Sequence, residues 1–103
     1  RLSVAESVNA IKDRKIDAFF WVGGIPTAAV TDLAATPGLK IKLIDHGDLA
    51  EKMNAKYGNL YTAAEIPAGS YPGAGANKNV DVWNILVTGN KMTDDEAYTI
   101  VKT

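Results

Sequence analysis

The run Ile16–Val22 constrains the fold of this chain more strongly than any other segment. It is apolar throughout except for Asp17, and it is rich in aromatic residues. An apolar run without alternating polar positions is typical of a strand that is buried on both faces, as in a parallel sheet. Asp17 fits a position near the edge of such a strand. Because this kind of strand needs strands beside it and helices covering it, the sequence predicts an α/β fold.

Helix signals stand on both sides of this run. In a capping box, a side chain at the helix start and a carboxylate three residues later each bind the other residue's backbone N–H. Three such pairs are present: Ser3 with Glu6, Asp48 with Glu51, and Thr93 with Glu96. The first predicts a helix from Ser3 to Arg14. A further helix is expected after Pro26, which fits a first helical turn, and before Thr36–Gly38.

Three more segments have the composition of strands. Leu39–Leu43 alternates apolar residues with lysines, which indicates a half-buried strand, and Leu60–Ile66 and Val80–Val87 are also predicted to be strands. Residues 67–79 are irregular and rich in Gly, Pro, Ala and Asn, which is typical of a functional loop. Helices and strands therefore alternate, and the predicted fold is α/β with a mixed or parallel sheet flanked by helices.

Charge and residue content narrow the function. A net charge of -1 leaves no basic excess for phosphates, so we expect no nucleic-acid partner. The chain contains no cysteine, which excludes disulfides, thiolate catalysis and cysteine-ligated metals. The single histidine, His46, lies within Asp45–Asp48, where one imidazole and two carboxylates are too few ligands for a metal. Since no catalytic serine motif is present either, the sequence predicts no enzyme, no cofactor and no metal.

The strongest candidate for a ligand site is the turn of Gly23, Gly24, Ile25, Pro26 and Thr27, here named the Gly23–Thr27 turn. It follows a predicted buried strand, and in open α/β sheets ligands bind beyond the carboxyl ends of strands. Free backbone N–H groups at a helix start attract anions, and glycines let a ligand approach the backbone. On spacing alone, a plain strand-to-helix turn explains the segment somewhat better.

Tyr71 is a second candidate, because it stands among the small residues of Ala68–Gly73. A tyrosine in such a loop offers a ligand both an aromatic wall and a hydroxyl group. An anchor that fastens the loop to the core explains the residue equally well. Trp21 and its aromatic neighbours are, on their pattern alone, most simply core residues.

Taken together, these segments resemble a known family. Ile16–Val30, Ile66–Gly73, the predicted strand Val80–Val87 and Met92–Tyr98 occur in the same order in the TAXI group of solute receptors. These receptors are the extracytoplasmic binding proteins of TRAP-type (tripartite ATP-independent periplasmic) transporters. The resemblance covers nearly the whole chain, and it depends on the ordered combination because no single motif is highly specific.

The resemblance implies a type II periplasmic-binding-protein fold, in which two α/β lobes joined by hinge strands enclose the ligand. Residues 1–22 would end the second lobe and form a hinge strand, and residues 23–103 would be the C-terminal part of the first lobe. It also implies binding of a small organic anion, glutamate-like or a dicarboxylate, and delivery to a membrane permease. One wall of the site would then be the Gly23–Thr27 turn with Trp21 and Tyr71. Since neither segment contains arginine, the charge partner of a carboxylate would lie elsewhere.

Two other classes of function fit the sequence less well. One is a small α/β interaction or regulatory domain without a small ligand, and the other is a lobe of an enzyme. Helix signals at both ends predict a part of a longer protein, which counts against the first, and the missing catalytic groups count against the second. Taken alone, the chain is expected to expose apolar surface or to pair with another copy.

Overall fold

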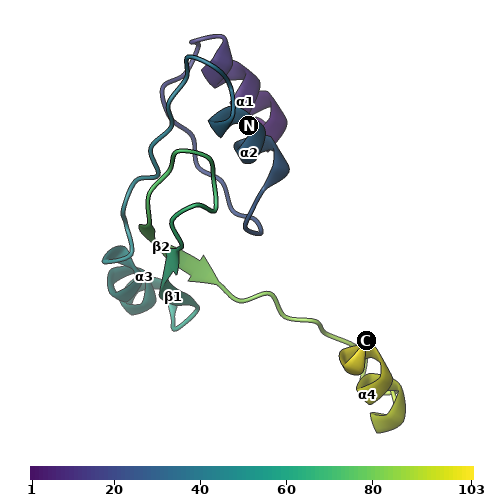
Figure 1. The fold of residues 1–103 in the computed structure, drawn as a ribbon. Helices are drawn as coiled ribbons and strands as arrows, with labels where there is room; N and C mark the ends of the chain where they lie inside the picture. The colour runs from purple at the N-terminus through teal and green to yellow at the C-terminus, as the bar shows by residue number, and fades with distance from the viewer.

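Four helices and a two-stranded sheet make up residues 1–103, all of which the computed structural model describes. In chain order the elements are α1 (Val4–Lys12), α2 (Ala28–Ala34), α3 (Leu49–Tyr57), β1 (Tyr61–Ile66), β2 (Asn77–Val82) and α4 (Asp94–Lys102) (Figure 1). The chain is therefore a small α/β domain, which confirms the predicted class. All four predicted helices are present.

Capping boxes start two of these helices as the sequence predicts. At α1, the Glu6 carboxylate accepts a hydrogen bond from the Ser3 N–H at 2.7 Å, and the Ser3 hydroxyl accepts one from the Glu6 N–H at 3.2 Å. Thr93 and Glu96 make the same exchange at the start of α4. Each pair satisfies two backbone donors that the helix itself leaves free, so both helix starts are determined locally.

The third predicted capping box does not form. Asp48 precedes α3 but has helical backbone angles, φ -64° and ψ -17°, and its side chain makes no capping hydrogen bond. A capping residue needs an extended backbone to turn its side chain toward the first N–H groups. At α3 the donors are satisfied by the backbone instead, since the N–H groups of Leu49 and Ala50 bind the carbonyls of His46 and Gly47.

The two strands predicted at Ile16–Val22 and Leu39–Leu43 are not formed, so both predictions were wrong. No ladder of hydrogen bonds joins either segment to a neighbour. Phe20 is fully exposed, and Trp21 is 47% exposed. A strand exists only where a second strand satisfies its N–H and C=O groups, and composition cannot supply that partner.

The sheet that does form is antiparallel rather than mixed or parallel. It pairs β1 with β2 in a register that runs from Tyr61 opposite Val82 to Ile66 opposite Asn77. The last strand was predicted at Val80–Val87, but β2 begins earlier and ends at Val82, because β1 offers no residues beyond Tyr61 to pair with. Residues 83–87 continue as unpaired chain.

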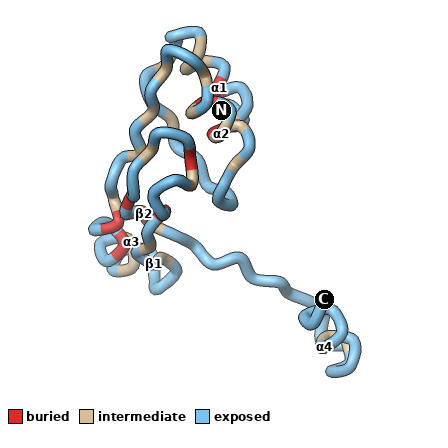
Figure 2. The backbone as a smooth tube through the Cα atoms, in the orientation of Figure 1, coloured by how far each residue is buried: buried red, intermediate tan, exposed pale blue.

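The core is small and lies between α2 and the β1–β2 connection. Val30, Ile66 and Tyr71 form its buried centre, and it is extended by partly buried apolar residues: Val4, Phe19, Ala34, Ile41, Leu43 and Ala74. Helix α1 packs against α2, where Lys12 and Asp32 form a surface ion pair. Figure 2 shows the buried positions gathered in this part of the chain and around the start of α3.

The molecule is elongated. Its radius of gyration is 17.5 Å, whereas a compact domain of 100 residues has about 13 Å. The reason is visible in Figure 1, where α4 lies apart from the other elements at the end of an extended segment. That segment carries large exposed apolar side chains, among them Trp83, Ile85 and Leu86. None of the helices has the length and apolar content needed to cross a membrane.

Candidate functional site

Thr27 is the centre of the candidate site. It precedes α2 with an extended backbone, φ -92° and ψ 123°, which is the position of a helix cap. Its hydroxyl does not cap the helix, because it donates to the Gly24 carbonyl at 2.7 Å and accepts from the Trp21 indole N–H at 2.9 Å. The threonine side chain therefore ties the Gly23–Thr27 turn to the tryptophan before it.

Tyr71 reaches the same residue from a distant part of the chain. Its phenolic oxygen accepts a hydrogen bond from the Thr27 backbone N–H at 3.0 Å. The side chain is only 4% exposed and packs with Val30 and Ile66 in the core. The connection between β1 and β2 thus holds the start of α2 in place, and Tyr71 is a core anchor whose polar end lies at the turn.

The two glycines of the turn differ in their surroundings. A Cβ at Gly23 would stand 2.6 to 2.7 Å from atoms of the Trp21 indole ring, so the indole lies directly against this residue. A Cβ at Gly24 would meet no atom within 4 Å. Gly23 therefore accommodates the tryptophan, and the open face of the turn is at Gly24.

The predicted site residues are therefore brought together to different degrees. Trp21, Gly24, Thr27 and Tyr71 form one hydrogen-bonded group, and Gly23 joins it by packing. Ile25 and Pro26 belong to the turn, with a cis peptide bond between them, and Ile25 is 46% exposed. The role of all seven residues in binding a ligand stays a prediction.

One physical argument for the site is weaker than the sequence suggested. Helix α2 has 7 residues, and its first capping position already donates its N–H to Tyr71. A helix of two turns has a small dipole, and one of the donors meant for an anion is in use. Any attraction of this wall for a ligand must therefore come mainly from its side chains and its open turn.

A second group of contacts escaped the sequence analysis. One carboxylate oxygen of Asp45 accepts hydrogen bonds from the Asn77 side-chain amide at 2.7 Å and from the Lys78 N–H at 2.8 Å. The N–H groups of His46 and Gly47 both donate to the Lys78 carbonyl. These residues clamp the start of β2, directly after the loop that carries Tyr71. No local sequence pattern predicts a contact between positions 45 and 77.

A cavity of about 230 Å³ lies beside this clamp. Its lining comes from Ile41, Lys42, Leu43, Asp45 and the small residues Gly73, Ala74, Gly75 and Ala76. The cavity therefore lies between the unpaired segment before α3 and the second half of the β1–β2 connection, which carries Tyr71. The sequence signal for it was the run of small residues in that loop.

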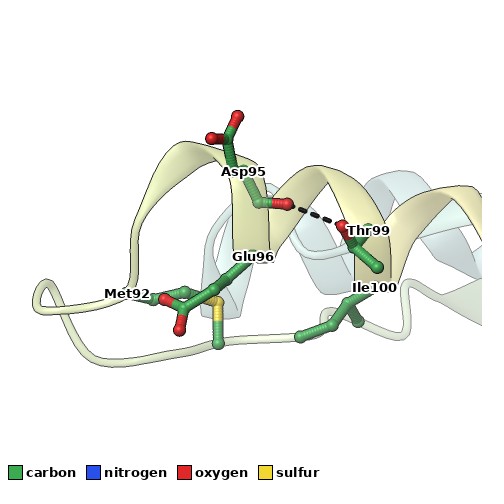
Figure 3. A pocket seen from close by; sticks show the side chains of 5 residues that line it. All are labelled: Met92, Asp95, Glu96, Thr99 and Ile100. Carbon is green, nitrogen blue, oxygen red and sulfur yellow. Dashed lines mark hydrogen bonds between the residues drawn. The ribbon is translucent and has the colours of Figure 1, made fainter.

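Two other groups of titratable residues lie outside the candidate site. The His46 imidazole is bonded to the Ile44 carbonyl at 2.7 Å, and no group of acidic residues and histidine is arranged to hold a metal. A surface hollow of about 430 Å³ lies on α4, lined by Met92, Asp95, Glu96, Thr99 and Ile100. In Figure 3 the Asp95 carboxylate points away from Glu96, and the backbone carbonyl of Asp95 accepts a hydrogen bond from the Thr99 hydroxyl. All the lining comes from one helix and its approach, so nothing encloses a ligand.

Taken together, these elements define a small α/β domain of four helices and a two-stranded antiparallel sheet. The chain belongs to the NMT1-like family, whose family model matches residues 1–103. Domains of this family are related to periplasmic binding proteins, the TAXI receptors among them. No solved structure matches the chain.

Proposed function

We propose that this chain is part of an extracytoplasmic solute receptor that binds a small organic anion and delivers it to a TRAP-type transporter. The observation that carries the proposal is the hydrogen-bonded group of Trp21, Thr27 and Tyr71. It joins two segments that lie far apart in the sequence and leaves the turn open at Gly24. Membership of a family related to periplasmic binding proteins supports the same conclusion.

In this proposal the chain supplies one wall of a cleft between two lobes. Residues 1–22 end the second lobe and enter the hinge, and residues 23–103 belong to the first lobe. The exposed apolar side chains of Phe20 and Val22 support this division, because a second lobe packed against residues 1–22 would bury them. Ligand contact with both lobes would stabilise the closed form, which is the form a transporter distinguishes.

The proposed activity is binding without chemical conversion. No pair of side chains in the site combines a nucleophile with a base, since Thr27 is hydrogen-bonded to a carbonyl and an indole. Neither the Gly23–Thr27 turn nor the connection of residues 67–76 contains a charged side chain. We therefore place the cation that neutralises the ligand outside these two segments.

Thermal unfolding of the full-length protein tests the proposal. L-Glutamate, succinate and glutarate are added separately, with putrescine as a cationic control. A ligand that binds only the native state raises the unfolding temperature. At a ligand concentration of 100 times Kd, the free energy of unfolding increases by about 2.7 kcal/mol. Stabilisation by at least one of the anions supports a receptor, and no shift with any of them contradicts it.

One observation favours a second candidate, an α/β interaction domain without a small ligand. Trp83, Ile85 and Leu86 are each more than three-quarters exposed on unpaired chain, which is typical of a surface that meets another protein. The same thermal unfolding experiment separates the two candidates. An interaction domain shows no stabilisation by any of the small molecules.

A further inference from the structure

The Tyr71 hydroxyl group has one unused hydrogen-bonding function. Its oxygen accepts from the Thr27 backbone N–H, which can only donate. The phenolic hydrogen must therefore point to some other acceptor. No carbonyl, carboxylate or hydroxyl of the chain takes a hydrogen bond from it, although the residue is only 4% exposed. A donor with no acceptor in the chain is suited to a group that the chain itself does not contain.

The donors of the neighbouring side chains, in contrast, already have acceptors within the chain. The Trp21 N–H and the Thr27 hydroxyl both have acceptors within the group, at 2.9 Å and 2.7 Å. The hydrogen of Tyr71 is consequently the single free side-chain donor there. Backbone N–H groups of Gly23, Gly24 and Ile25 also lack partners within the chain, so further donors border the open face of the turn.

We propose that Tyr71 determines the specificity of this wall by donating its phenolic hydrogen to a carboxylate oxygen of the solute. The proposal rests on the function proposed above and assigns the chemistry of one ligand group. A carboxylate is a pure acceptor and matches a free donor. An ammonium group is a pure donor and cannot accept the phenolic hydrogen. The wall therefore takes the acid end of an amino acid or diacid, and the amine of an amino acid lies on the far side of the cleft.

The role of Thr27 in this arrangement is positioning. Its backbone N–H fixes the phenolic oxygen as an acceptor, and that N–H is held by the turn into α2. Because the contact uses the backbone, side-chain changes at position 27 leave the polarity of the tyrosine unchanged. Substitution of Tyr71 itself is the direct test.

The experiment compares the full-length protein with its Tyr71→Phe variant by calorimetric titration of succinate, L-glutamate and the neutral diamide succinamide. Tyr57→Phe is the matched control, since Tyr57 lies on α3 with 58% of its surface exposed. Loss of a hydrogen bond to a charged group should weaken binding of both acids by about 10- to 100-fold in Tyr71→Phe alone. Binding of succinamide, if measurable, should change much less.

Each outcome has a distinct meaning. If the wild-type protein binds an acid and Tyr71→Phe binds it equally well, this inference is overturned and the receptor function stands. If the wild-type protein binds none of these probes and is stabilised by none of the anions in the thermal test, the receptor function fails together with the inference. Should Tyr71→Phe not fold, the exchange of the Tyr71 hydroxyl proton in the wild-type protein is measured by NMR instead. Slowed exchange of that proton with succinate bound supports the donation, and unchanged exchange contradicts it.

Discussion

The backbone N–H of Thr27 donates a hydrogen bond to the phenolic oxygen of Tyr71 at 3.0 Å, between residues 44 positions apart. The bond joins the start of α2 to the loop between β1 and β2. On one side of it Tyr71 packs in the core, and on the other side Thr27 holds the indole of Trp21. The stability of the core and the geometry of the candidate site are consequently linked through these two residues.

Thr27→Val should release Trp21 while Thr27→Ser should not. Valine has nearly the shape of threonine but cannot accept from the indole or donate to the Gly24 carbonyl. We expect a loss of about 1 kcal/mol in the free energy of unfolding. In a Trp83→Phe background, Trp21 fluorescence should shift to longer wavelength in the valine variant. Equal spectra for the serine and valine variants would show that the hydroxyl does not hold the indole.

Substitutions at Gly23 and Gly24 should have different effects. Gly24→Val places its side chain in open space, so it should weaken ligand binding with an unfolding temperature close to that of the wild type. Gly23→Val meets the Trp21 ring and should displace it. Gly89→Val, also in open space but remote from the site, is the control for both. Unchanged affinity in Gly24→Val would remove this glycine from the binding surface.

Asp45→Ala should loosen the loop that carries Tyr71. It removes the acceptor for the Asn77 amide and the Lys78 N–H, and Asn77 is only 4% exposed. Leaving these donors unpaired should lower the free energy of unfolding by about 1 to 2 kcal/mol and speed hydrogen exchange at Lys78. Asp48→Ala is the matched control, because the Asp48 side chain makes no capping bond. Equal exchange rates in the two variants would argue against the clamp.

The capping carboxylates should make helix stability depend on pH. Hydrogen bonds from the Ser3 backbone N–H, and then from its side chain, lower the pKa of Glu6 below the ordinary value of 4.5. Since the folded pKa is the lower one, the stabilisation is full above about pH 4.5 and is lost as the pH falls through the folded pKa. Glu6→Gln should therefore reduce the fall in unfolding temperature between neutral pH and pH 3.

The control for that experiment is Glu51→Gln, at the corresponding position of α3, where no capping box forms. A carboxylate titration of Glu6 followed by NMR provides an independent measurement. A midpoint at or above 4.5 would contradict the capping contact as the cause.

The 103-residue chain by itself should self-associate through residues 83–87. Trp83, Ile85 and Leu86 are exposed on backbone without a strand partner, and such edges pair with other chains. Ile85→Lys should shift sedimentation toward the monomer. Lys91→Ala, on the same connecting segment, should have no such effect. A wild-type chain that sediments as a monomer at all concentrations would disprove this expectation.

Short-range patterns predicted the helices well. The capping boxes at Ser3 and Thr93 need only partners three residues away, and both formed where the sequence placed them. Asp48 has the same pattern and failed, because the backbone at that position is already helical. A capping motif thus marks a helix start, but the preceding turn decides whether its side chain is used.

Long-range pairing could not be predicted in the same way. Ile16–Val22 has the composition of a buried strand, yet it pairs with nothing in this structure, and β2 is limited by the length of β1. For the candidate site, the bond between Trp21 and Thr27 spans six residues and lies within reach of local reasoning. The contact between Asp45 and Asn77 spans 32 residues, and the sequence around either residue does not predict the other as its partner.

The amino-acid order by itself determined the α/β class, the helix starts and the choice of the Gly23–Thr27 turn and Tyr71 as candidates, because these depend on neighbours a few residues apart. Only the tertiary structure decided that the two candidates are one group and that the phenolic hydrogen of Tyr71 is left free. It also decided that the sheet is antiparallel. A hydrogen bond between distant residues depends on where the whole chain places its donor and acceptor, and that position is a property of the packed core.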